Sequence, residues 1–157
     1  MIFVTVGTQL PFDRLVGAVD GWAVRSGEKV FAQVGPSTAR FENIETAPFL
    51  TPDETAERVR GASLVVAHAG MGTIFTSLAA RRPLLVLPRR AELGEHRNDH
   101  QLATARRLGE RGIVTVAWDA TELGARLDSF EDVAVAPPIG DSAESRLLDA
   151  VRDFLNT

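Results

Sequence analysis

A histidine and two glycines stand together directly after a short apolar segment of the chain. The segment is Leu64–Ala67, the histidine is His68, and the glycines are Gly70 and Gly72. A continuous apolar run of this length predicts a strand buried on both faces, then a tight turn and a helix that begins near Gly72 or Thr73. The free N–H groups and positive dipole end of such a helix attract anions, and an imidazole can donate to a phosphate oxygen. This spacing therefore favours a phosphate site at the end of the strand.

Two glycines can also form a tight turn that binds nothing, and two familiar phosphate motifs do not fit them. The dinucleotide fingerprint needs a third glycine where Phe75 stands. Glu92 lies about 20 residues beyond Gly72, as the ribose-binding acid of that fingerprint would, but the motif comes late in the chain rather than in its first unit. The sequence Gly-x-x-x-x-Gly-Lys-[Ser/Thr] does not occur. A nicotinamide dehydrogenase therefore fits poorly, and a P-loop nucleotidase is excluded.

Histidines and arginines gather after a later apolar segment. His96 and His100 are four residues apart, but the zinc-protease pattern needs a glutamate where Arg97 stands, and no third ligand is signalled. The chain has no cysteine and no Asp-x-Asp pair, so we predict no metal site and no cofactor. We interpret Arg89, Arg90 and Arg97 as a solvated rim, with the alternative that they balance the charge of a diphosphate.

Length and composition limit the class of protein. The chain has 157 residues, a formal net charge of −4 and 45% hydrophobic residues. We expect one domain, residues 1–157, and no nucleic-acid partner, because nucleic-acid binders usually present a basic face. No apolar segment approaches the roughly 18 residues that a membrane span needs. Met1–Val4 lacks a basic region and leads directly into a strand, so we expect no signal peptide.

Strands and helices alternate along the chain. β-Branched and apolar runs predict strands at residues 2–6, 30–34, 44–49, 64–67, 84–87 and 113–116. Capping residues and helical spacing predict helices that begin near Pro11, Thr51, Gly72, Asn98 or Asp99, Thr121 and Ser142. Such alternation predicts parallel crossover units and a Rossmann-like three-layer α/β sandwich with a mostly parallel sheet.

Three motifs together resemble one family. They are His68–Thr73, the later pair His100–Gln101, and Phe3–Thr8 followed by Pro11–Phe12. The combination resembles the donor-binding half of a GT-B glycosyltransferase of family 28. It is most similar to the branch that contains the small catalytic subunit of the eukaryotic transferase adding the second N-acetylglucosamine to a dolichol-linked sugar, and bacterial half-subunits of exopolysaccharide synthesis. The resemblance covers essentially the whole chain and implies a fold equivalent to the C-terminal half of a GT-B enzyme.

The resemblance also implies roles for individual residues. His68 and the N–H groups around Gly72 and Thr73 would hold the diphosphate of a nucleotide-sugar, and Thr8 would face the same phosphates. Phe49 and Leu50 match the position that contacts the uracil ring, and His100 and Gln101 match the pair that binds the donor sugar. The implied substrate site comprises Gly7, Thr8, Phe49, Leu50, His68, Gly70, Met71, Gly72, Thr73, Glu92, His100 and Gln101. Within it, His68 is the predicted catalytic residue.

One position departs from the family pattern. Many GT-B enzymes have a glutamate eight residues after the histidine, where it binds the ribose hydroxyls, and here that position is Thr76. Ribose recognition would then fall to another group, for which Glu92 is the candidate.

The resemblance implies a donor-binding catalytic subunit of a two-component glycosyltransferase. Such a subunit would move a sugar from a UDP-sugar to a membrane-associated acceptor, a lipid-linked glycan or an exopolysaccharide, held by a membrane-anchored partner subunit. It would be cytoplasmic and peripheral to the membrane through that partner. Two alternatives stay open: a non-catalytic nucleotide-sugar-binding subunit that regulates or scaffolds another transferase, and an unrelated hydrolase or epimerase that uses the same phosphate site.

Overall fold

The protein is built around a six-stranded sheet in which every pairing is parallel. The structure is a computed structural model that describes residues 1–135 and Asp149. The strands are β1 (Ile2–Thr5), β2 (Val30–Gln33), β3 (Glu45–Ala47), β4 (Leu64–Ala67), β5 (Leu84–Val86) and β6 (Thr115–Val116). Their order is β3-β2-β1-β4-β5-β6. This order reverses between β1 and β4, and ligands of open α/β sheets bind outside the carboxyl ends of the strands at such a switch point.

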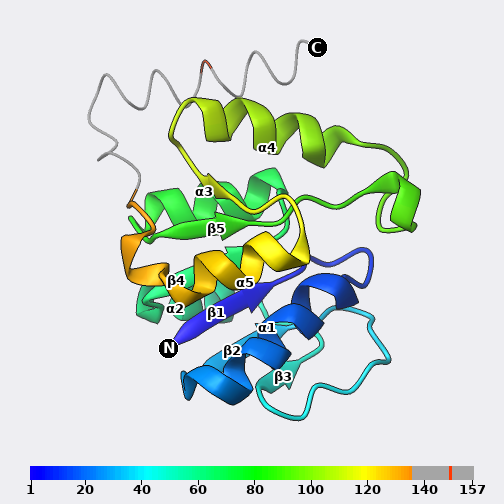
Figure 1. Cartoon of the computed structure of the whole chain (residues 1–157), viewed down its shortest axis with the longest axis vertical. Helices are drawn as coiled ribbons and strands as arrows, with labels where there is room; N and C mark the ends of the chain where they lie inside the picture. The colour runs from blue at the N-terminus through cyan, green and yellow to red at the C-terminus, as the bar shows by residue number, and fades with distance from the viewer. Residues whose placement is uncertain (136–148, 150–157) are drawn as a thin grey trace.

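Helices cover both faces of the sheet, as Figure 1 shows. They are α1 (Asp13–Ser26), α2 (Pro52–Gly61), α3 (Met71–Ala79), α4 (His100–Glu110) and α5 (Ala120–Asp128), with short 3-10 turns η1 (Ala91–Leu93) and η2 (Phe130–Asp132). One apolar core contains residues of α1 and α5, and the other contains residues of α2, α3 and α4. The described part of the chain therefore has the predicted three layers.

The central strands are apolar on both sides because both faces are covered. In β1, Ile2 and Val4 belong to the core under α1 and α5, while Phe3 belongs to the opposite core. In β4, Leu64 and Val65 divide in the same way. All five side chains are fully buried, which explains why these strands read as continuous apolar runs rather than as alternating ones.

The helix starts agree with the sequence in part. The capping box of Thr51 and Glu54 is confirmed, with Glu54 N–H donating to Thr51 Oγ1 at 3.2 Å and Thr51 N–H donating to Glu54 Oε2 at 2.7 Å. By contrast, α1 begins at Asp13, because Phe12 has a non-helical backbone and packs its ring into the core, so Pro11 lies outside the helix.

Two further predictions concern the last helix and membrane-spanning segments. The helix expected from Ser142 lies outside the described residues, apart from the helical Asp149. Among the described residues, no helix combines the length and the apolar character needed to cross a bilayer.

Candidate functional site

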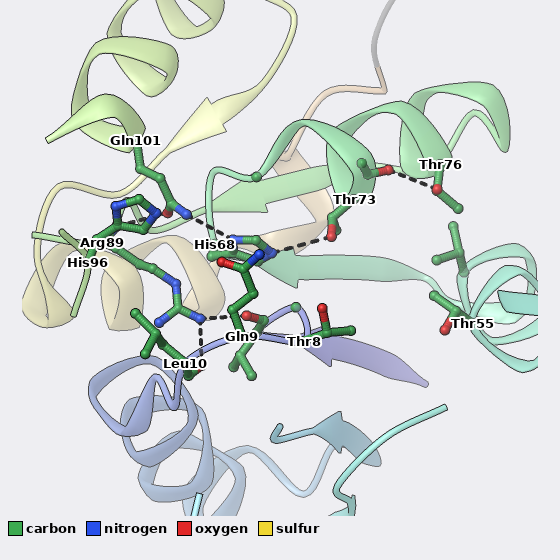
Figure 2. A pocket seen from close by; sticks show the side chains of 15 residues that line it. Thr8, Gln9, Leu10, Thr55, His68, Thr73, Thr76, Arg89, His96 and Gln101 are labelled. Carbon is green, nitrogen blue, oxygen red and sulfur yellow. Dashed lines mark hydrogen bonds between the residues drawn. The ribbon is translucent and has the colours of Figure 1, made fainter. Parts of the chain in front are cut away.

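A cleft of about 470 Å³ opens at the switch point, beyond the carboxyl ends of β1 and β4. Its lining is Val6, Gly7, Thr8, Gln9 and Leu10 from the β1–α1 loop, Thr55 and Val59 from α2, His68, Gly70, Gly72, Thr73 and Thr76 from the β4–α3 turn and α3, and Arg89, His96 and Gln101 from the segment after β5. Figure 2 shows Gln101, Arg89, Gln9 and Thr73 gathered around His68, with Thr55 and Thr76 farther from it. The predicted site residues Gly7, Thr8, His68, Gly70, Gly72, Thr73 and Gln101 are thus brought together.

The helix α3 begins at this cleft without a side-chain cap. Gly70 is the N-cap residue in an extended conformation, and the first helical bond runs from Ile74 N–H to Gly70 O at 3.1 Å. The N–H groups of Met71, Gly72 and Thr73 precede that bond, so none has a carbonyl acceptor within the helix. The start of α3 matches the prediction to within a residue or two, and the backbone donors of Gly72 and Thr73, two residues that line the cleft, stand at its wall.

The two glycines of the turn have different roles. A Cβ atom at Gly70 would overlap the His68 ring, and one at Gly7 would lie 2.9 Å from His68 Nε2. At Gly72 a Cβ atom would meet nothing within 4 Å. Gly70 and Gly7 therefore leave space for the protein's own His68 ring. Gly72, by contrast, leaves its backbone open to a bound ligand. Gly70 still lines the cleft, so its predicted place in the substrate site stays a prediction.

His68 is held neutral in this setting. Its burial lowers its pKa from 6.5 to about 3, and the nearby Arg89 and His96 act in the same direction. Its Nδ1 lies 3.1 Å from Gln101 Nε2, and its Nε2 lies 3.5 Å from Thr73 Oγ1. A neutral ring still carries one N–H donor, so His68 can contribute a hydrogen bond to an anion but no positive charge.

Arg89 is buried, which corrects its interpretation as part of a solvated rim. Only 3% of the residue is exposed. Its guanidinium donates to the carbonyl oxygens of Val6, Leu10 and Pro11 in the β1–α1 loop, and also to that of Glu95. Burial lowers the pKa of Arg89, and the Glu95 carboxylate opposes this shift. Arg89 therefore fastens the loop that forms one wall of the cleft, and it places a cation beside the site.

Sequence reasoning also missed Gln33 at the carboxyl end of β2. Its Nε2 donates to Gly7 O at 2.9 Å and to Pro48 O at 2.8 Å, while its Oε1 accepts from Thr5 Oγ1 at 2.7 Å. Gln33 is 4% exposed, and it ties the β1–α1 loop to the segment after β3. The available signal was a lone amide side chain at the end of an otherwise apolar strand.

Several predicted residues do not line the cleft. Glu92 has a 72% exposed side chain that pairs with Arg90 at 3.5 Å, and His100 is exposed at the start of α4. Met71 and Leu50 pack against the core beneath α2, α3 and α4. Phe49 is 52% exposed just beyond β3, at the same edge of the sheet as the cleft. The ligand contacts expected of these residues stay predictions.

No carboxylate lines the cleft within the described part of the chain. Glu95, the nearest candidate, is engaged by Arg14 through two bonds of 2.9 Å and accepts the N–H of Arg90 at 3.0 Å. Among the described residues, no group of three or more His, Cys, Asp or Glu side chains could hold a metal ion. The cleft thus offers backbone amides, a neutral imidazole, hydroxyls and a nearby guanidinium, a set suited to an anion.

A sequence profile described as the glycosyltransferase family 28 C-terminal domain matches residues 1–133. The chain belongs to this family. Among its relatives is the human UDP-N-acetylglucosamine transferase subunit ALG13, 32% identical over 124 residues that make up 71% of this chain and 10% of the human protein. The ALG13 subunit of Eremothecium gossypii is 28% identical over 149 residues, 92% of this chain and 71% of the relative. This family 28 chain therefore spans only a small part of the human protein and most of the fungal one.

Solved structures agree with the fold of the family 28 chain. The solution structure of ALG13 has a TM-score of 0.64 at 21% identity and covers 94% of each chain. The calicheamicin glycosyltransferase CalG4 has a TM-score of 0.60 at 15% identity and covers 98% of this chain and 38% of its own. The chain is thus equivalent in fold to part of a GT-B glycosyltransferase, as predicted.

Proposed function

We propose that this chain is the donor-binding catalytic subunit of a two-component glycosyltransferase that uses a UDP-sugar. The diphosphate would lie in the cleft between β1 and β4, against the uncapped start of α3 and the Nε2 side of His68. The observation that carries this proposal is the convergence of the backbone N–H groups of Gly72 and Thr73, which have no acceptor within the helix, and a neutral imidazole at the switch point of the sheet. Membership of family 28 and the similarity to ALG13, a UDP-N-acetylglucosamine transferase subunit, support the UDP-sugar as the donor class.

The strength of this site suits a nucleotide-sugar. A hydrogen bond to a charged group contributes about 1.5–3 kcal/mol, and a helix dipole about 0.3–1 kcal/mol. Two or three such bonds together with the dipole give about 3–10 kcal/mol before the costs of binding, a range that covers the roughly 4–8 kcal/mol that millimolar to micromolar affinity requires. Arg89 adds a fixed positive charge behind the cleft wall without competing for the hydrogen bonds, because its N–H groups are directed at carbonyl oxygens.

Transfer would break the bond between the anomeric carbon and the β-phosphate oxygen. The electron pair leaves with UDP, whose growing negative charge is met by the α3 amides and the His68 N–H. The acceptor hydroxyl oxygen forms the new bond to the anomeric carbon, and its proton goes to a base. Because no carboxylate of the described residues lines the cleft, we propose that the partner subunit supplies the base and holds the acceptor.

We propose further that the partner is membrane-anchored and carries a lipid-linked or exopolysaccharide acceptor, which would place this chain at the cytoplasmic face of a membrane. A non-catalytic scaffold subunit is the main alternative. A hydrolase or epimerase is less well supported, since such chemistry needs acid–base groups in the pocket, and Glu92 and Glu95 are respectively outside it and paired.

The test is sugar transfer assayed with the matched partner subunit, using His68→Ala and the control Val24→Ala, which changes a 65% exposed residue of α1 that does not line the cleft. The proposal expects His68→Ala to lower transfer about 100-fold or more while the two chains still associate, a loss typical of removing one donor to a developing anion. Unchanged transfer by His68→Ala would make this chain a scaffold.

A further inference from the structure

Gln101 approaches His68 from the other side of the cleft, from the first turn of α4 (Figure 2). The residue is 8% exposed, and all three of its amide contacts are within the protein. Its Oε1 lies 3.1 Å from both the Ala69 and the Arg89 backbone nitrogen, and its Nε2 lies 3.1 Å from His68 Nδ1. These contacts use the amide oxygen twice and one side of the NH2 group.

These contacts determine which way the amide faces. Two backbone N–H groups, one from the β4–α3 turn and one from the segment after β5, can be accepted only by the amide oxygen. The NH2 group of Gln101 must then face the ring. Because an NH2 group only donates, Nδ1 of His68 must be the acceptor, and the single proton of the neutral imidazole must reside on Nε2.

The ring is also fixed in position. Gly7 and Gly70 border it so closely that neither has room for a Cβ atom. Among the described residues, the hydrogen-bond partner of its Nε2 atom is Thr73 Oγ1, at the long distance of 3.5 Å, on the side where α3 begins. The Nε2–H group can therefore donate a shorter hydrogen bond to a ligand oxygen that lies near the Gly72 and Thr73 amides.

We propose that Gln101 is a positioning residue that fixes His68 as the Nε2–H tautomer, so that the ring presents a donor, not a lone pair, to an anion at the start of α3. The opposite tautomer would aim a lone pair at a phosphate oxygen and repel it. The role in phosphate binding rests on the proposed function, whereas the tautomer is a property of the free protein. Gln101 thus influences ligand binding indirectly: it orients the His68 ring, and it joins the β4–α3 turn to the segment after β5.

The tautomer is tested on the isolated chain by nitrogen NMR of ¹⁵N-histidine-labelled protein, with His68→Gln used to assign the signals. The proposal expects His68 to show a protonated Nε2 and an unprotonated Nδ1 throughout pH 6–8. A protonated Nδ1 in the wild-type protein would overturn it. This measurement needs no ligand. If UDP fails to bind but the Nε2–H tautomer is observed, the proposed function is rejected and the inference about the tautomer is kept.

The variant Gln101→Glu sharpens the test, because a carboxylate can accept both backbone N–H groups and also faces Nδ1 with an acceptor. We expect the His68 proton to move to Nδ1 and UDP affinity at pH 8 to fall at least tenfold. The added negative charge alone could also weaken binding, so the same substitution is made in His68→Ala protein. If Gln101 acts through the ring, most of the loss disappears in that background. An equal loss with and without His68, or an unchanged tautomer in Gln101→Glu, would overturn the proposal.

Discussion

The two ends of the sheet are built from different interactions. At the amino end, backbone groups supply most of the links: Ile2 N–H donates to Lys29 O, Ser63 N–H to Met1 O, and Val65 N–H to Pro83 O, each at 2.9 Å, and the exposed Ser63 hydroxyl adds a bond to Met1 O at 3.1 Å. At the carboxyl end, buried polar side chains join one loop to the next. Four of the six buried polar residues among those described lie at or just beyond that end, namely Thr5, Gln33, Arg89 and Gln101.

Because of this difference, residues at the two ends of one strand can serve different roles, stability at the amino end and ligand binding at the carboxyl end. Strand β4 begins at Leu64 and ends at Ala67, and His68, which follows it directly, lines the cleft whereas the strand residues do not. Buried polar groups stabilise a fold only when all their bonds are made, so a network such as that of Arg89 is useful mainly for holding loops in one geometry. We therefore expect substitutions at the amino end to change unfolding free energy alone, and those at the carboxyl end to change ligand binding as well.

The largest effect should come from the amino end. Leu64→Ala removes a fully buried side chain and should lower the free energy of unfolding by about 2–5 kcal/mol, since it leaves a cavity in the core. Urea unfolding measures this, and calorimetry should find the UDP affinity of the folded protein unchanged. The control is Val24→Ala, at a 65% exposed position. A large change in affinity with Leu64→Ala would show that the two ends are not separable.

At the carboxyl end, Arg89→Met should affect both properties. It leaves the carbonyl oxygens of Val6, Leu10 and Pro11 without their donor, and unsatisfied buried groups cost about 1–3 kcal/mol. We expect a loss of that size in unfolding free energy together with weaker UDP binding, because the loop wall is released. Arg97→Met, at an exposed position on the same segment, should change neither. Lost stability with intact affinity would limit Arg89 to a structural role.

The pH dependence of stability tests the burial of His68. The unfolded chain binds a proton below about pH 6.5, whereas the native ring has a pKa of about 3, so native stability falls as pH is lowered from 6.5 towards 3. The slope from this group is at most about 1.4 kcal/mol per pH unit. His68→Gln should flatten the curve between pH 4 and 6, and His100→Gln should retain it. Equal slopes in the wild type and His68→Gln would contradict the neutral, buried ring.

The smallest effect on folding should come from Gly72→Ala. The added methyl meets open space and favours the helix, so stability should stay constant or rise by up to about 1 kcal/mol. The same methyl would crowd a ligand at the start of α3, and UDP affinity should fall roughly tenfold, the equivalent of one weakened charged hydrogen bond. Gly21→Ala, at an open position within α1, is the matched control. Unchanged affinity in Gly72→Ala would remove the ligand from this site.

The sequence was most informative where local pattern decides structure. Continuous apolar runs located β1, β4 and β5, and the turn after β4 with His68, Gly70 and Gly72 was predicted because histidine and glycine stand at a strand-to-helix junction. The capping box of α2 was equally local. Family resemblance added Gln101, which no local pattern singles out.

What could not be predicted depends on contacts across the sheet. Arg89 reads as a surface residue until the β1–α1 loop is placed against it, 83 residues away from Val6. Gly70 reads as a ligand-facing glycine until the His68 ring is seen to occupy its Cβ position. Likewise, Gln101 meets His68 only because the segment after β5 returns beside the β4–α3 turn. Strand order sets the contacts of Arg89 and Gln101 and was not derivable from the strands taken singly, whereas the Gly70 contact depends on the side-chain direction of His68 within its own turn.

The central claim is that a diphosphate binds where the start of α3 meets His68. Amide and imidazole NMR during titration of the isolated chain with UDP, compared with uridine, tests it most directly. The account predicts saturable shifts centred on the Gly72 and Thr73 amides and on His68 Nε2, with uridine binding far more weakly because it lacks the phosphates. Equal responses to uridine and UDP, or shifts that leave these three groups unmoved, would contradict it.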